Sequence, residues 1–243
     1  MRQSAVRPRR DQIDALTRGV QLPLPAIEAT FLEVIAESLS RAFHDVCTDH
    51  PGTVDAGSEA EVTALLVTRL NEMLDQDPLL RQLVNCVVRG AETVSFDGSR
   101  LEKRPDLSLY LSSREHNFPL VAETKILDST AAKTEVLYCD KGLRRFLEGE
   151  YAWANREAIM IAYVRDDSSI NGKLTPFLSE AMKLKPPRYS VELLPVAPGS
   201  GASDRAWSRH GRTFLYTHQS PPAAPGAIRI LHLWLSCETS RAG

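Results

Sequence analysis

The sequence has little of several features that define common protein classes. No stretch of its 243 residues approaches the roughly 20 consecutive apolar residues that cross a bilayer. It contains no P-loop, no Rossmann glycine fingerprint and no G-x-S-x-G nucleophile motif. Its four cysteines lack the close spacing of a zinc site and stand at Cys47, Cys86, Cys139 and Cys237. These absences argue against a membrane-spanning protein and against the enzyme classes that those motifs mark.

The sequence also lacks the signs of secretion. Scattered cysteines in a chain of this length do not indicate a disulfide framework, so we expect buried, reduced thiols. The basic N-terminus MRQSAVRPRR is not followed by the apolar segment of a secretory signal. We therefore expect a cytoplasmic location and no membrane partner.

An excess of positive charge is missing as well. The formal net charge is -2 and the sequence pI is about 6.3, so any contact with nucleic acid has to rest on local basic clusters. The hydrophobic content of 43% is enough for a sizeable core. We expect residues 1–24, with their prolines and basic cluster, to form a flexible lead-in, and residues 25–243 to form a single domain.

The apolar periodicity predicts a mixed α/β fold. Helical spacing predicts helices at 25–46, at 58–75, just after Pro78, at 135–151 and at 174–184. Alternating or continuous apolar runs predict strands at 93–96, 106–111, 118–127, 158–164, 189–195, 212–217 and 228–236. This order favours a mixed sheet flanked by helices, and His232 on its apolar strand is expected to be a hydrogen-bonded core histidine.

The strongest chemical pattern joins two neighbouring strands. Residues i and i+2 of a strand share a face, so Glu123 and Lys125 point the same way. Asp106 opens the preceding strand, and the intervening length suits a hairpin that brings both carboxylates and the amine to one edge. Carboxylates are the ligands that Mg²⁺ prefers. A solvated strand face with a turn aspartate is the alternative interpretation of the same spacing.

A glutamate on the helix at 58–75 extends this pattern. At about 100° per residue, Glu59 falls on the apolar stripe with Leu66 and Leu70. Glu61 falls on the opposite side, where it can form a capping box with Ser58. A carboxylate on a buried stripe needs a partner, which a metal site, an arginine or an exposed first turn could supply.

At these residues the sequence resembles the PD-(D/E)xK superfamily, whose members have the restriction-endonuclease-like fold. The signature reads Pro105-Asp106 and then Glu123-Thr124-Lys125, and with the helix glutamate it covers roughly residues 55–165. The resemblance implies a three-layer α/β/α core with a mixed central sheet, here with extra N-terminal helices and C-terminal strands. It implies Mg²⁺- or Mn²⁺-dependent cleavage of phosphodiester bonds, with DNA favoured over RNA. Asp106, Glu123 and Glu59 would be metal ligands, and Lys125 would assist catalysis.

The segment KGLRRFLEGEYA is also similar to uncharacterised nuclease-like proteins of bacterial anti-phage and mobile-element loci. The superfamily includes members that have lost activity. A catalytically silent subunit that binds DNA or a protein partner therefore stays open as an alternative. A metal-dependent hydrolase that acts on nucleotides is a third possibility.

Basic side chains outside the motif are candidates for contact with nucleic acid, because phosphates are bound by such groups without sequence readout. They are Lys141, Arg144, Arg145, Arg209, His210 and Arg212. A solvated surface is the alternative interpretation. Because the chain carries a net charge of -2, we expect it to act with a partner, either an ATPase or helicase subunit or a second copy of itself.

Overall fold

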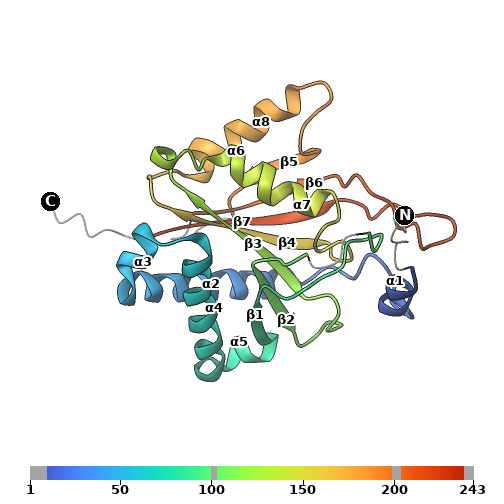
Figure 1. Ribbon diagram of the computed structural model, residues 1–243, viewed down its shortest axis with the longest axis horizontal. Coiled ribbons are helices and arrows are strands. Elements are labelled where there is room, and N and C mark those ends of the chain that lie inside the picture. Colours follow the sequence, from blue (N-terminus) through green and yellow to red (C-terminus); the bar gives the residue numbers. More distant parts are fainter. Residues whose placement is uncertain (1–9, 100–102, 199–203, 238–243) are drawn as a thin grey trace, which may run out of the picture.

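In the part of the chain that the structure describes, seven strands form one mixed sheet with helices on both faces (Figure 1). The computed structural model describes residues 10–99, 103–198 and 204–237. The strands are β1 (Val84–Arg89), β2 (Leu107–Leu111), β3 (Leu120–Leu127), β4 (Glu157–Val164), β5 (Val191–Val196), β6 (Asp204–His210) and β7 (Ile228–Ser236). The longer helices are α1 (Arg10–Thr17), α2 (Ala29–Asp49), α4 (Glu59–Gln76) and α8 (Thr175–Lys183). The shorter ones are α3 (Pro51–Ala56), α5 (Pro78–Leu83), α6 (Glu135–Tyr138) and α7 (Arg144–Leu147), with single turns η1 (Ser129–Ala131), η2 (Cys139–Leu143) and η3 (Ile170–Leu174).

The strand order is β1-β2-β3-β4-β7-β6-β5. The three central strands β3, β4 and β7 run parallel, and the outer pairs are antiparallel. Parallel strands are normally covered by helices on both faces, so their side chains are buried on both sides. β4 fits this arrangement, because it is almost continuously apolar and buried. The mixed α/β class expected from the order of elements is therefore correct.

Side chains of the central strands point alternately into two separate hydrophobic cores. On β4, Ile159 and Ile161 pack with α2 and α4, whereas Met160 and Ala162 pack with α6, α7 and α8. Figure 1 shows α2 to α5 on one side of the sheet and α6 to α8 on the other. Because this alternation fixes which way each side chain points, it also fixes the face on which the charged residues of β3 lie.

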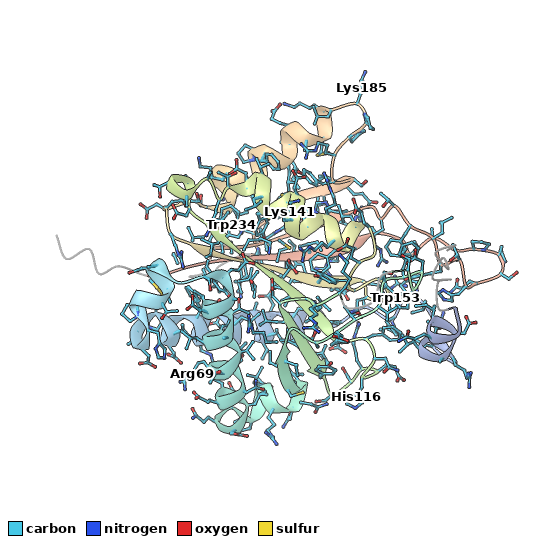
Figure 2. The ribbon with its side chains drawn as sticks, viewed as in Figure 1. Arg69, His116, Lys141, Trp153, Lys185 and Trp234 are labelled. Atoms are coloured by element: carbon cyan, nitrogen blue, oxygen red, sulfur yellow. A yellow bond between two sulfur atoms is a disulfide. The ribbon has the colours of Figure 1, made fainter. Side chains whose placement is uncertain are left out.

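The segment before residue 25 differs from the expected flexible lead-in. Residues 10–17 form α1, and Ile13 and Leu24 are buried against Trp153. Figure 2 places Trp153 at the end of the sheet next to this helix. Residues 1–9 lie outside the described residues. Residues 10–24 are ordered because their apolar side chains pack against residues that are distant in the sequence. The local composition does not reveal such contacts.

Three strand assignments need correction. Residues 93–96 form a single bridge, between Thr93 and Lys103, and no strand. The edge strand β1 was not expected. The strand expected at 212–217 is irregular, whereas 204–210, which falls in the gap between the strands expected at 189–195 and 212–217, forms β6. Its alternate residues Ala206, Ser208 and His210 face the core, and the polar ones among them find hydrogen-bond partners there.

The expectation of four reduced thiols is also wrong. Cys47 near the end of α2 and Cys237 just after β7 form a disulfide, whereas Cys86 and Cys139 are free. The two bonded cysteines are 190 residues apart, so no local spacing could indicate the pair. Among the described residues, no helix is long and apolar enough to span a membrane.

The helix expected at 135–151 is interrupted by a wide turn. α6 passes into the π-helical turn η2 and then into α7. Gly142 in this turn lies so close to the sheet that a β-carbon there would come within 2.5 Å of Met160 Cε and 3.6 Å of Glu123 Cγ. Wide turns of this kind are frequent at functional sites. The close approach brings the start of α7 directly over the charged residues of β3.

Candidate active site

The acidic residues gather where strand β3 loses its neighbour. β2 pairs with β3 from Leu120 to Ala122, and beyond that point β3 has an open edge. Two carboxylates take the place of the missing strand: the backbone N–H of Thr124 donates to Asp106 Oδ2 at 2.8 Å, and that of Ile126 donates to Glu59 Oε2 at 3.2 Å. Buried backbone N–H groups need acceptors. This need explains why both acids are held against the strand.

A hydroxyl network on the α4 face fixes Asp106 further. Thr124 points toward α4, as the alternation requires, and its hydroxyl donates to Asp106 Oδ2 at 3.0 Å. The Thr124 hydroxyl also lies 3.1 Å from that of Thr63, which contacts the hydroxyl of Tyr163. The residue between the two charged positions of the motif thus orients the aspartate.

Lys125 lies at the centre of three carboxylates. Its Nζ is 3.0 Å from Glu59 Oε1, 3.0 Å from Glu123 Oε1 and 3.9 Å from Asp106 Oδ2. The sequence expectation that these four side chains meet at one edge of the sheet therefore matches the geometry. The phase of the helix also matches, because Glu61 is turned away and forms the capping box with Ser58.

Burial sets the protonation of the two central groups. It raises the pKa of the Glu123 carboxyl to about 7, helped by the Asp106 carboxylate and opposed by Lys125 and Arg145. Burial acts to lower the pKa of the Lys125 ammonium, but the surrounding carboxylates outweigh it and hold that pKa above its usual range. Lys125 therefore stays charged at neutral pH, whereas the Glu123 carboxyl takes up a proton near neutral pH.

Arg145 at the start of α7 makes a second cationic contact with Glu123. Its Nη1 donates to Glu123 Oε1 at 2.8 Å and to the Tyr151 hydroxyl at 2.8 Å. The guanidinium carbon is 5.6 Å from the centre of the Tyr151 ring, and the tyrosine hydroxyl donates to the carbonyl of Arg104. Sequence reasoning placed Arg145 among the phosphate-binding residues but missed this ion pair and Tyr151. No local pattern reveals them, because the π-turn alters the helical phase.

The residues present suit a hard divalent cation in one specific respect. Glu123 Oε2 is buried and has no hydrogen-bond partner in the described part of the chain, although Oε1 has two. An unpaired buried carboxylate oxygen is costly, and a metal ion would relieve it. Within the described residues no three acidic, histidine or cysteine side chains are already arranged around a common metal position. Lys125 Nζ occupies the centre of the cluster instead.

Comparison with known proteins adds no relative. No family model, no curated protein and no solved structure matches the chain. The functional argument therefore rests on the geometry of this cluster.

The expected nucleic-acid residues fall into two groups. Lys141 is exposed on η2, above the sheet in Figure 2, and Arg144 next to it is partly exposed and pairs with Asp140. Arg145 lies over the acidic cluster. These three residues lie on one continuous helical segment, of which Arg145 reaches the acidic cluster.

Two of the three residues in the second group do not suit phosphate contact. His210 is fully buried, with Nδ1 on the Tyr189 carbonyl and Nε2 on the Ser208 hydroxyl. The guanidinium of Arg212 is bound to backbone carbonyls, including those of Trp153 and Asn155. Both side chains therefore stabilise the fold. Arg209 is exposed on β6 and pairs with Glu192.

Proposed function

We propose that this chain is a divalent-metal-dependent nuclease of the PD-(D/E)xK type that hydrolyses phosphodiester bonds, DNA rather than RNA. The observation that carries the proposal is the convergence of three carboxylates on Lys125 at the open edge of β3. The unpaired buried oxygen of Glu123 supports it, because that atom is suited to a metal ligand.

The arrangement of the sheet agrees with a restriction-endonuclease-like core. The acid lies just before β2, the acid-x-lysine pair lies on β3, and the helix glutamate opens α4; β2 and α4 both pack against β3. Helices on both faces of a mixed sheet suit the proposed three-layer α/β/α architecture. β6 and β5 would then be additions beyond the strands that hold the site.

In this proposal each side chain has a distinct task. Asp106 and Glu123 would hold Mg²⁺ or Mn²⁺, with Glu59 completing the acidic shell. The bound ion supplies polarisation of a phosphoryl oxygen and acidification of a water molecule. Lys125, which stays charged, would donate to a non-bridging phosphate oxygen or hold the attacking water in line. Lys141 and Arg144 would lie along the path of the phosphate backbone.

Cleavage assays test the proposal directly. Supercoiled plasmid and linear duplex DNA are incubated with the protein and Mg²⁺ or Mn²⁺, with EDTA as the blank. We expect metal-dependent cleavage that Asp106→Asn and Lys125→Ala each reduce by on the order of a hundredfold or more. Glu61→Gln serves as the matched control for Glu59→Gln, because only Glu59 faces the cluster. Cleavage that persists in Asp106→Asn and Lys125→Ala would contradict the assignment.

One observation favours a second candidate, a nuclease-fold subunit that binds DNA or a protein without cutting. Glu123 Oε1 is already paired with two cations, Lys125 and Arg145, which compete with a metal for this carboxylate. Tight, metal-independent DNA binding without cleavage in Mg²⁺ or Mn²⁺ would favour this subunit over the enzyme. Metal-dependent product formation would exclude it.

A further inference from the structure

The ion pair between Arg145 and Glu123 links a buried carboxylate to the surface. Glu123 has 1% of its side chain exposed, whereas Arg145 has 34% exposed. Among the described residues, only Nη1 of the guanidinium has hydrogen-bond partners. The arginine thus pairs with the acid through one nitrogen, and its Nε and Nη2 donors are available for a further partner.

The two cations at Glu123 differ in how firmly they are held. Lys125 has 10% of its side chain exposed and contacts Glu59 as well as Glu123. Arg145 contacts Glu123 alone among the acids of the cluster. A divalent ion on Glu123 would repel both cations, and the more exposed, less tightly held one moves at the smaller cost.

Tyr151 would keep a displaced Arg145 close to the site. Its hydroxyl accepts from Arg145 Nη1, and its ring lies 5.6 Å from the guanidinium carbon. Once it leaves the carboxylate, the guanidinium would bind a phosphate of the substrate, because its planar donors match two phosphate oxygens.

We propose that Arg145 couples metal binding to phosphate binding: it pairs with Glu123 in the metal-free chain and turns to a backbone phosphate of the nucleic acid once a divalent cation takes Glu123. This inference rests on the proposed nuclease function and adds a regulation of the same site. Coupling of this kind is reciprocal, so DNA tightens metal binding as much as metal tightens DNA binding. The metal-free chain then holds nucleic acid weakly.

Calorimetric titration with Mn²⁺ tests the coupling, with and without a fully phosphorothioate duplex that resists cleavage. For the wild type we expect the duplex to raise Mn²⁺ affinity on the order of tenfold. Arg145→Gln removes the competing cation, so its Mn²⁺ affinity without DNA rises on the order of fivefold, and the DNA effect shrinks to about twofold. Arg145→Lys keeps the charge but not the planar donors, and should show affinity near the wild type with weak coupling.

The matched control is Arg81→Gln on α5, which removes an exposed arginine paired with Asp75 and should change neither affinity. Thermal melting checks that each variant folds. Wild-type values for Arg145→Gln, or a loss of its Mn²⁺ affinity without DNA, would overturn the proposal, since the second result marks a purely structural support of Glu123. Failure of the wild type to cleave ordinary DNA would overturn the nuclease proposal alone, and the two affinities would still decide the role of Arg145.

Discussion

At the scale of single residues, Asp106 and Glu59 have two tasks at once. Each accepts a backbone N–H from the open edge of β3 and each lies within 4 Å of Lys125 Nζ. A strand edge that is not covered by a neighbour needs acceptors, and carboxylates supply them here. Stability and chemistry are therefore linked at this edge, and substitutions can separate the two.

Substitutions at Asp106 can separate the effect on stability from the effect on metal binding. Asp106→Ala leaves the N–H of Thr124 without its acceptor and should lower the free energy of unfolding by about 1–3 kcal/mol. Asp106→Asn retains an oxygen that can accept, so we expect stability near the wild type with a loss of Mn²⁺ affinity. Denaturant unfolding in EDTA measures the first effect and calorimetry the second. Equal stability of the wild type and the alanine variant would show that the N–H contact is not needed.

The sequence predicted these acidic residues better than the arginine beside them. The period of 2 placed Glu123 and Lys125 on one face of their strand, and the period of 3.6 placed Glu59 on the apolar side of its helix. That Glu59 joins the other two in one cluster was implied by the family resemblance. The contact of Arg145 depends on the π-turn, and that of Tyr151 on the loop that follows α7. Neither depends on a periodic pattern, so both had to come from the three-dimensional arrangement.

At the scale of elements, Gly142 brings the π-turn η2 close to Met160. A β-carbon at this position would meet Met160 Cε, the end of a flexible side chain, at 2.5 Å, so Gly142→Ala should force Met160 to repack at a cost of about 1 kcal/mol of stability. Met160→Ala makes room at the cost of a cavity. We expect the double variant to be less destabilised than the two single effects added together, as measured by denaturant unfolding of all four proteins. Additive effects would mean that the contact does not constrain the turn.

A buried hydrogen-bond chain joins α6, which leads into the π-turn, to β7 and β6. The Tyr138 hydroxyl contacts His232 Nδ1, and Ser208 lies between His232 Nε2 and His210 Nε2. The expectation that His232 is a hydrogen-bonded core histidine is therefore confirmed. β6 escaped prediction because its inward serine and histidine are polar, and their partners come from distant residues.

Burial lowers the pKa of His210 to about 4, below the 6.5 of an exposed histidine. The unfolded chain then binds more protons between these values, so this contribution to stability is complete above pH 6.5 and is lost as the pH falls toward 4. The loss should reach about 3 kcal/mol by pH 4. Denaturant unfolding of the wild type and of His210→Asn measures it, and we expect a flatter pH dependence for the variant. The exposed His116→Gln is the control, and an equally flat profile there would contradict the assignment.

At the scale of the whole molecule, the Cys47–Cys237 disulfide fastens the end of β7 to α2. A cross-link over 190 residues restricts the unfolded chain strongly, so its loss should lower the free energy of unfolding by about 2–4 kcal/mol. Unfolding of the wild type with and without dithiothreitol, compared with Cys47→Ser/Cys237→Ser, measures this. The reduced wild type should match the double variant. Identical unfolding midpoints for the oxidised wild type and the double variant would show that the bond contributes nothing.

At the same scale, the net charge of -2 affects how strongly the chain binds DNA and says little about its fold. Non-specific affinity for DNA depends on how many phosphates are neutralised, and the described basic cluster beside the site is small. We expect weak DNA binding by the isolated chain at physiological salt, with an ATPase or helicase subunit supplying the rest of the contact. Sizing and salt-titrated binding check this. A stable homodimer that binds and cuts DNA efficiently by itself would remove the need for a partner.

A crystal structure determined after soaking in Mn²⁺, with its anomalous signal, tests the central claim most directly. We expect one manganese peak bound by Asp106 and by Glu123, including the Oε2 atom that now lacks a partner, and Arg145 turned away from Glu123. Absence of a peak at saturating Mn²⁺, with Lys125 and Arg145 still paired to Glu123, would contradict the metal-dependent account.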